Sequence, residues 1–504
     1  MVEWSERRMV LTLLTLGLAI RLYLALTSFC IAADGVAYVK MARLFAAGDW
    51  AGALARVFSP LYPMLIAVAH HLIPNWELAG SLVSAVLGAA AVPMVYFLMR
   101  EIEDGRDLAA GAAALTAIHP ELASYSASVL TEGGYFFFVV AVVYFAVRGI
   151  RLQSVRWIAV GGIVNGIAYL YRTEAVGLPV AVAAFLVAGP FIWGEWRSGF
   201  SARASAVYLV LFAAVASPYL IYLRLNTGHW IVGREVAAAL SFKISEVSQD
   251  GARWQALGFS PYVPLGAMLR QVPTLYLKKT AMDFARSFYY FVQALEPPVA
   301  IALLLGLRKR GRAVLTEWRQ ALPAAIVIFY FCGLALLNTG RRFLAHYMIL
   351  TFGWAALGVA VAAAWLSSVE LPGGRRIPAG AMVLGLALVT LPRTLWPLGY
   401  DMRGFREAGV LISRASGNAR AVVSGDSRVA FYAGAEYLPL PPSAKLDLCQ
   451  WLGTHPQAGY VMLTSRDEGN AEDPSRARCL ALVKRYHRYG RGYYDLFKVV
   501  NSGQ

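Results

Sequence analysis

Long apolar stretches recur along the first four hundred residues of the chain and are separated by short charged turns. Many of these stretches approach or exceed the roughly 17 residues that a helix needs to cross the hydrocarbon core of a bilayer. We therefore expect a polytopic membrane protein with roughly eleven spanning helices. They would lie at residues 9–28, 78–99, 108–126, 132–148, 156–171, 175–193, 205–223, 291–307, 322–338, 343–366 and 377–396.

Two further segments of the N-terminal region predict helices that do not span. Residues 60–74 are apolar but number only about fifteen, and they include three prolines and two histidines, so an interfacial or re-entrant helix is expected. Just after the first span, Ala37, Met41, Leu44 and Phe45 recur at helical spacing. This pattern predicts a helix lying on the membrane surface.

The hydropathy falls after Pro397, and the remaining residues have the pattern of a small soluble α/β domain. Four apolar runs predict strands and two segments predict helices. The strands would be at 421–425, 436–441, 459–464 and 493–500, and the helices at 426–434 and 474–486. We therefore expect an all-α membrane domain at 1–398, with an outer loop at 29–76 and a long outer segment at 223–290, followed by a soluble domain at 399–504.

Composition and charge support this division. Hydrophobic residues make up 58% of the chain and charged residues only 15%, against about 25% in an average soluble domain. The net charge of +16 comes mainly from Lys and Arg in short connections between spans, which indicates topology rather than nucleic-acid binding. The basic connections predict a cytoplasmic N-terminus and a C-terminal domain on the outer side. In that domain Cys449 and Cys479 could form a disulfide or remain two buried thiols.

Two acidic residues stand out against this apolar background. Asp34 lies at the start of the predicted surface helix, with Tyr38 one turn later, and either a helix cap or a reactive carboxylate fits that position. Glu132 lies at the outward end of an apolar span, where an ionised carboxylate without partners costs several kcal/mol. A hydrogen-bonded packing residue next to Thr131 is the structural alternative for Glu132.

Several cations are predicted at the same outward side. Arg172 and Glu174 stand at one junction of two spans, and Arg341 and Arg342 at another, against the positive-inside tendency. Guanidinium groups in such positions need a carboxylate or a phosphate. A cavity with two carboxylates and several arginines would suit group transfer from a lipid phosphate, because a carboxylate can accept a hydroxyl proton while cations stabilise the departing phosphate.

Four motifs in the first 180 or so residues resemble the GT-C membrane glycosyltransferases, especially bacterial relatives of protein O-mannosyltransferase and of lipid A aminoarabinose transferase. They are DGVAYVKMARLFAAGDW, SPLYPMLIA, HPELASYSASVLTEGGYFFF and YLYRTE, in that order. The resemblance implies an inverting transfer from a polyprenyl-phosphate sugar, with Asp34 as base and Glu132 at the family's other acidic position. Some GT-C enzymes use a divalent metal, for which Asp34 and Glu132 would be the oxygen ligands.

This chain departs from the family pattern at two places. Gly35 follows Asp34 where many members have a second acid, and Phe58 and Ser59 stand where relatives often have a basic residue. The phosphate contacts then fall to Arg172, Lys243, Arg341 and Arg342, with Tyr38 and Glu174 as further candidate contacts. No glycine-rich nucleotide loop is found, in keeping with a lipid-linked donor.

The leading hypothesis is a glycosyltransferase of a bacterial inner membrane that acts at the periplasmic face on a lipid, glycan or protein acceptor. A transporter or lipid flippase is the main alternative, because charged residues in spans also mark substrate pathways. Against it, no self-similarity is found between the halves of the chain, and the polar residues crowd one face. A receptor that binds a partner through its C-terminal domain is the third hypothesis.

Overall fold

The computed structural model divides into two compact units, and each is described by itself. The first unit comprises Met1–Tyr23 and Met41–Trp396, and the second comprises Leu24–Lys40 and Pro397–Gln504. The residues that the structure describes are 5–236, 273–337, 339–368, 370–371, 375–376, 378, 380–415, 421–440, 448–464, 479–488 and 492–500.

The first unit contains the membrane-spanning helices. Within the described residues, seven helices are long and apolar enough to cross a membrane, or up to eight if one bent pair counts as a single span. The chain is therefore a mostly helical polytopic membrane protein. The seven are α1 (Glu6–Leu26), α5 (Trp76–Ile102), α8 (Glu132–Arg151), η1 with α10 (Thr173–Ile192), α11 (Ser198–Thr227), α18 (Trp318–Leu336) and α19 to α20 (Arg341–Ser368).

The predicted count of roughly eleven spans is too high for this part of the chain, because four of the predicted spans are short or interrupted helices. The segment 108–126 is broken into α6 (Arg106–Ile118) and α7 (Pro120–Ala127), and 291–307 crosses a 107° bend between α15 (Pro273–Leu295) and α16 (Pro297–Arg310). The other two are α9 (Val155–Tyr171) and α21 (Gly380–Thr394). Hydropathy detects apolar length but not the prolines at which the first two of these segments break.

Shorter elements complete the first unit. The helix α4 (Leu61–His70) is too short to span, in agreement with the sequence. The remaining elements are α2 (Ala33–Ala46, which continues into the second unit), α3 (Trp50–Leu54), η1 (Thr173–Val176), α10 (Gly177–Ile192), α17 (Ala313–Thr316), α19 (Arg341–Met348), η2 (Ile349–Thr351), α20 (Phe352–Ser368) and the strands β1 (Glu370–Leu371) and β2 (Arg375–Arg376).

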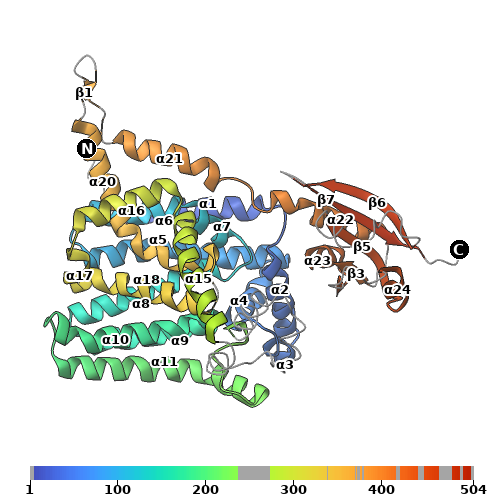
Figure 1. The fold of residues 1–504 in the computed structure, drawn as a ribbon, viewed down its shortest axis with the longest axis horizontal. Coiled ribbons are helices and arrows are strands. Elements are labelled where there is room, and N and C mark those ends of the chain that lie inside the picture. The colour runs from blue at the N-terminus through green and yellow to red at the C-terminus, as the bar shows by residue number, and fades with distance from the viewer. Residues whose placement is uncertain are drawn as a thin grey trace. The chain divides into compact units, whose positions relative to one another are not determined.

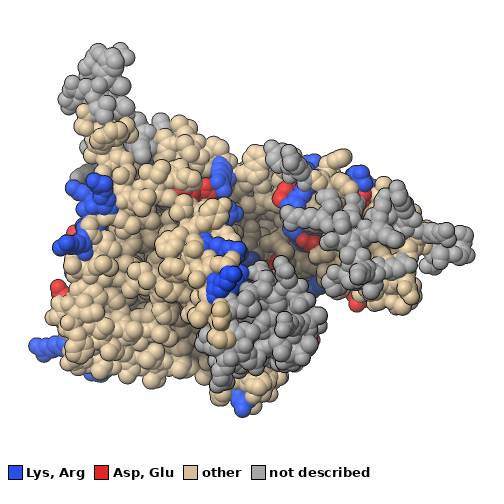
Figure 2. Space-filling model, in the orientation of Figure 1, with Lys and Arg blue, Asp and Glu red and all other residues tan. Residues whose placement is uncertain are grey.

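The helices of the first unit pack side by side (Figure 1). The helix α8 lies between α5 and α9, and α11 packs on both α9 and α10. A second close pair, α16 and α20, meets at glycines, since a Cβ added to Gly358 would lie 1.7 Å from the Ala302 carbonyl oxygen. The surface visible over α8 to α11 in Figure 2 has almost no charged side chains, as expected for helices that face lipid.

The break between α6 and α7 is stabilised by a buried arginine. Pro120 is the first residue of α7 and cannot donate a backbone hydrogen bond, so the last carbonyls of α6 need other donors. The Arg21 side chain, which is fully buried, donates to the carbonyls of Thr116 and Ala117 at 3.1 Å each. The Thr394 hydroxyl donates to the Ile118 carbonyl at 2.7 Å. This arrangement fixes α7, which leads directly into the start of α8.

The two ends of α8 carry different charge clusters. At its C-terminal end, Arg148 and Arg151 both pair with the buried Glu101 of α5. Arg310 and Gln320 contact Glu103, which follows Glu101 two residues later in the chain. The opposite end begins at Glu132, roughly 30 Å away for a helix of this length.

The second unit is built on a five-stranded sheet with the order β4-β3-β5-β7-β6. The strand β3 (Ala421–Ser424) is parallel to both β4 (Glu436–Pro439) and β5 (Ala458–Thr464), whereas β7 (Tyr493–Val499) is antiparallel to β5 and to β6 (Leu480–His487). The helices are η3 (Tyr400–Met402), α22 (Arg403–Ala415), α23 (Arg428–Ala433) and α24 (Leu448–Gly453). This is the small C-terminal α/β sheet domain that the sequence predicts.

One element of this domain was predicted wrongly. The segment 474–486 was expected to be a helix, but Leu480–His487 form β6 at the edge of the sheet. Pairing with β7 sets the conformation of this segment and overrides its local pattern. Only Leu480 and Tyr486 are buried in β6, apart from which its residues are exposed. Cys449 and Cys479 form a disulfide with a Cα separation of 5.7 Å, which settles the alternative left open by the sequence.

Residues 24–40 pack with the C-terminal domain, a grouping that hydropathy does not indicate. The Phe29 backbone N–H donates to the Leu398 carbonyl at 2.8 Å. The Ile31 N–H donates to the Tyr432 hydroxyl at 2.7 Å, and Cys30 lies in the core formed by α22, α23 and one face of the sheet. The segment that carries Asp34 therefore belongs to the same compact unit as the sheet.

Candidate active site

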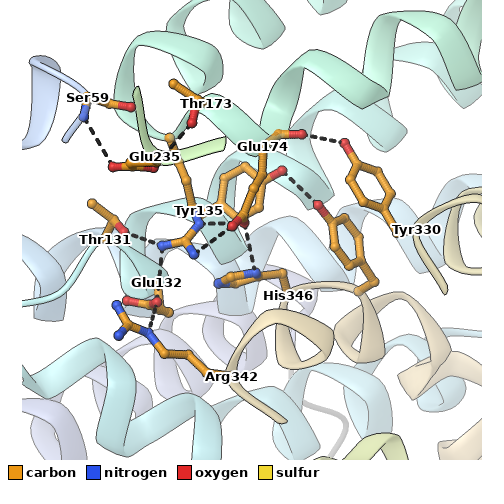
Figure 3. Close-up of polar contacts among 12 residues, drawn as sticks. Ser59, Thr131, Glu132, Tyr135, Thr173, Glu174, Glu235, Tyr330, Arg342 and His346 are labelled. Atoms are coloured by element: carbon orange, nitrogen blue, oxygen red, sulfur yellow. Dashed lines mark hydrogen bonds and ion pairs between the residues drawn. The ribbon is translucent and has the colours of Figure 1, made fainter. Parts of the chain in front are cut away.

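The candidate site is centred on Glu132, the first residue of α8, whose side chain is fully buried in the first unit (Figure 3). Two glycines that follow Glu132 let this helix end approach its neighbours. A Cβ on Gly133 would lie 2.6 Å from the Ser84 carbonyl oxygen, and one on Gly134 would lie 2.4 Å from the Tyr171 ring. The glycines thus bring a carboxylate into close contact with α5 and the end of α9.

Arg172 links three side chains of the site. It lies in extended conformation between α9 and η1, and its Nη1 donates to the Thr131 hydroxyl at 2.6 Å and to Glu132 Oε1 at 3.1 Å. Its Nε and Nη2 donate to the two carboxylate oxygens of Glu174 at 2.6 and 3.0 Å. A planar guanidinium group can make such a fork, whereas an ammonium group cannot.

The helix α19 supplies the other cation and a histidine. The Arg342 Nε donates to Glu132 Oε1. The Arg342 side chain is 30% exposed, whereas the Arg172 side chain is only 5% exposed. The His346 ring is fully buried, with its Nδ1 3.7 Å from Glu174 Oε2. Arg342 therefore carries the positive charge of the cluster toward the surface.

Some polar atoms of this cluster lack hydrogen bonds within the described part of the chain. They are the Oε2 atom of Glu132 and both ring nitrogens of His346. A buried polar atom without a partner costs about 1–3 kcal/mol, more for a charged group. The cluster therefore offers unsatisfied groups beside two guanidinium groups, which is an arrangement suited to a polar ligand.

Three tyrosines form one wall of the site. The Tyr135 and Tyr347 hydroxyl groups are 2.9 Å apart, and the Tyr347 ring stacks on Tyr330 with a centroid distance of 3.7 Å. The Tyr330 hydroxyl donates to the Glu174 backbone carbonyl at 2.9 Å (Figure 3). These rings are buried and hold the η1 turn against α8 and α18.

Glu235 is a site residue that the sequence analysis missed. Its carboxylate accepts hydrogen bonds from the Ser59 backbone N–H at 3.3 Å and from the Thr173 hydroxyl at 3.2 Å (Figure 3). Burial raises the pKa of Glu235 to about 7, an effect that Arg172 opposes and Glu174 reinforces. Glu235 lies eight residues beyond the end of α11 in a segment without periodicity, so only the fold brings it here.

Arg341 and Arg342 are neighbours in sequence but contact different carboxylates. Arg341 Nη1 lies 3.4 Å from the buried Glu121 Oε1 of α7. Arg393 pairs with Glu296 at 2.6 Å and lies 4.0 Å from Glu121. Arg341 thus belongs to a second charge cluster, which ties the bend between α15 and α16 to α7 and α21.

Asp34 and Tyr38, two further predicted site residues, lie on α2. Asp34 is in the first turn of α2 and is partly buried, and Tyr38 is 1% exposed. Both residues belong to the second unit. Lys243 lies outside the described residues. The structure therefore brings together Glu132, Arg172, Glu174 and Arg342 from the predicted set.

Within the described part of the chain, no group of three or more His, Cys, Asp or Glu side chains is placed to hold a metal ion. The metal suggested for Asp34 and Glu132 by the family resemblance stays a hypothesis.

Comparison with known proteins extends the resemblance seen in the sequence. Residues 58–222 match the family described as dolichyl-phosphate-mannose-protein mannosyltransferase. This matched segment includes Glu132, Arg172 and Glu174. No curated protein sequence matches the chain.

Three solved structures are similar over nearly the whole chain. An Archaeoglobus fulgidus oligosaccharyltransferase in the apo form aligns with a TM-score of 0.60 and 13% identity, covering 96% of this chain and 74% of that one. The archaeal oligosaccharyltransferase AglB from A. fulgidus, in complex with an inhibitory peptide and a dolichol-phosphate, aligns with a TM-score of 0.58, 14% identity and coverages of 98% and 74%. ArnT from Cupriavidus metallidurans, bound to undecaprenyl phosphate, aligns with a TM-score of 0.58, 14% identity and 98% coverage of both chains.

At such low identity these structures show a shared fold, and the family match adds a shared sequence segment that contains Glu132, Arg172 and Glu174 of the candidate site. The predicted resemblance is confirmed: the chain is similar in sequence to the mannosyltransferase family over residues 58–222, and it is similar in fold to ArnT over nearly its whole length.

Proposed function

We propose that this protein transfers one sugar from a polyprenyl-phosphate donor to a lipid, glycan or protein acceptor at the outer face of the membrane. The observation that carries the proposal is the convergence of Arg172 and Arg342 on the buried carboxylate of Glu132. Two of these three residues lie in the segment that matches the mannosyltransferase family. The ArnT and AglB structures contain undecaprenyl phosphate and dolichol-phosphate, which supports a polyprenyl-phosphate donor here.

The arginines would stabilise the leaving group. Transfer breaks the bond between the anomeric carbon and the phosphate oxygen, and negative charge builds on the departing polyprenyl phosphate. Arg342 is the more exposed cation and would contact that phosphate, while Arg172 holds Glu132 and Glu174 in place. Arg341 and Lys243 are further proposed phosphate contacts.

Asp34 is the proposed base. Its carboxylate would accept the proton of the acceptor hydroxyl as that oxygen attacks the anomeric carbon from the face opposite the phosphate, which inverts the configuration. Tyr38, one turn later on α2, would help to place the acceptor. Glu132 would orient Arg172 and Arg342 toward the phosphate.

The proposed topology has a cytoplasmic N-terminus and an outer C-terminal domain. Arg148, Arg151 and Arg310 are located at the end of the first unit away from Glu132, where basic residues would face the cytoplasm. The disulfide between Cys449 and Cys479 supports an oxidising compartment for the sheet domain, since such bonds are rare in the cytosol. A bacterial inner membrane with a periplasmic active face would meet both conditions.

The test uses the full-length protein reconstituted in nanodiscs with total lipid extract from its host. Mass spectrometry would follow the conversion of polyprenyl-phosphate sugars into polyprenyl phosphate and a glycosylated product. Asp34→Asn should reduce this conversion by at least roughly 100-fold, in the range lost with a general base. Near-normal transfer by Asp34→Asn would remove Asp34 from the mechanism.

Asp107→Asn is the matched control, because Asp107 is also an aspartate in the first turn of a helix but is exposed. If Asp34 only stabilises the start of α2, the two variants should behave alike in both stability and transfer. Movement of the lipid between leaflets without formation of a glycosidic bond would contradict the transferase proposal and favour a flippase.

A further inference from the structure

The segment Val232–Glu235 lies beside the candidate site and contacts three other parts of the first unit. The Tyr169 hydroxyl of α9 donates to the Val232 carbonyl at 2.7 Å, and Arg234 Nη1 donates to the Ala55 carbonyl at 3.0 Å. A Cβ on Gly233 would lie 2.4 Å from Cγ2 of Thr173, so the backbone packs directly on the η1 turn. These contacts fix the position of the residue that follows, Glu235.

The Glu235 carboxylate lies next to the turn that carries Arg172 and Glu174. Thr173, which donates to it, stands between Arg172 and Glu174 in the chain, and Ser59, just before α4, donates through its backbone N–H. Both contacts are donors, so the ionised carboxylate satisfies them fully. Glu235 is only partly accessible, and burial raises its pKa to about 7.

The charged groups next to Glu235 are balanced before Glu235 itself is counted. The carboxylates of Glu132 and Glu174 are matched by the guanidinium groups of Arg172 and Arg342, two negative charges against two positive. An ionised Glu235 adds a third negative charge beside this cluster.

The other titratable or charged groups that interact with Glu235 come from three elements. Arg172 and Glu174 lie in the η1 region, Tyr169 in α9 and Tyr219 in α11, while Arg234 is its neighbour in sequence. Arg234 also binds the Ala55 carbonyl, and Arg172 is engaged by Glu132 and Glu174. Neither cation is therefore dedicated to Glu235.

We propose that Glu235 is a third acidic group of this site and controls its affinity for a phosphodiester, binding being tight when Glu235 is protonated and weak when it is ionised. This inference rests on the proposed function, in that the site takes the phosphate of a lipid-linked sugar. It adds a residue that acts on the ligand through charge and through the position of the η1 turn, and the matched family segment ends before it.

The experiment measures binding of farnesyl methyl phosphate to the full-length protein in nanodiscs between pH 6 and 8.5. This probe is a diester, so its single negative charge is constant over the range. We expect the wild-type Kd to rise by about three- to tenfold toward high pH, as one added charge at short range and partial screening would produce. Glu235→Gln keeps the shape of the side chain and should hold the Kd at its low-pH value throughout.

Two variants separate this effect from a structural one. Thr173→Val removes a hydrogen bond that favours the ionised form, so the midpoint of the pH dependence should move to higher pH. Glu195→Gln makes the same change of charge at an exposed position and should leave the wild-type profile unchanged. If Glu235 has only a structural role, Glu235→Gln should weaken binding of the probe at every pH, and Thr173→Val should not shift the midpoint of the pH dependence.

The outcomes distinguish this inference from the proposed function. Equal pH dependence in wild type and Glu235→Gln would overturn the role of Glu235 while leaving the donor assignment intact. Failure of the wild type to bind the probe at pH 6 would count against both. Dimethyl phosphate, the headgroup without a chain, should show the same pH dependence at much weaker affinity. If dimethyl phosphate does not compete with farnesyl methyl phosphate for binding, the site does not recognise the phosphate group.

Discussion

Replacement of Arg172 by lysine tests whether one guanidinium group holds the site together. The arginine donates two hydrogen bonds to Glu174, one to Glu132 and one to Thr131. Lysine keeps the positive charge but has a single nitrogen, so it cannot span both carboxylates. In Arg172→Lys at least one of the two acids loses its contact with this cation.

The magnitude follows from burial. Arg172 is 5% exposed and Glu132 is fully buried, so water replaces the lost contacts poorly. A hydrogen bond to a charged group contributes about 1.5–3 kcal/mol, and breaking a buried ion pair costs about 3–5 kcal/mol. We expect Arg172→Lys to lower the free energy of unfolding by about 3–4 kcal/mol, since lysine retains part of the attraction.

Arg342→Lys is the matched control, because Arg342 also pairs with Glu132 but its side chain is 30% exposed. Its loss of stability should be about 1 kcal/mol, as for a partly solvated ion pair. Unfolding of both variants would be measured in mixed micelles of a mild detergent and increasing dodecyl sulfate. The reasoning is refuted if Arg172→Lys costs less than about 1 kcal/mol or no more than Arg342→Lys.

Three further outcomes can be measured on the same preparation. Gly358→Ala should destabilise the protein by more than about 2 kcal/mol through overpacking of α16 on α20, whereas Gly333→Ala, in open space on α18, should be neutral or stabilising. Loss of the disulfide in Cys449→Ser should cost about 3 kcal/mol and change mobility on a non-reducing gel. Because the folded-state pKa of Glu235 is raised from 4.5 to about 7, stability present at low pH should fall as the pH rises through 7, and Glu235→Gln should remove that decline.

Hydropathy predicted most of the fold because apolar length is a local property. It located α1, α5, α8, α10 and α18 within a few residues. It could not show the break at Pro120, which depends on donors from Arg21 and Thr394 far away in the sequence. The strand β6 was mistaken for a helix for a related reason, since its conformation is set by pairing with β7.

The candidate site was predicted where unusual charges occur inside apolar motifs. Glu132 and Arg172 are conspicuous because ionised residues at the ends of spans need partners, and the structure pairs them. Glu235 gave no such signal, because it lies outside the predicted spans, where an acid is ordinary. The separation of Arg341 from Arg342 was also out of reach of the sequence, since it depends on which helix end faces each side chain.

The charges around Glu132 are difficult to explain by stability alone. A buried ion pair gains little over well-packed apolar side chains, because removing the charges from water costs as much as their attraction returns. At the other end of α8, Glu101 meets Arg148 and Arg151, which are 29% and 33% exposed and so keep part of their hydration. Around Glu132, by contrast, the guanidinium group of Arg172 is almost wholly buried as well, and both ring nitrogens of His346 lack hydrogen bonds among the described residues. That cost is offset if the cluster gains its remaining partners from a ligand, which is why the same residues that weaken the fold here are the ones expected to bind the donor phosphate.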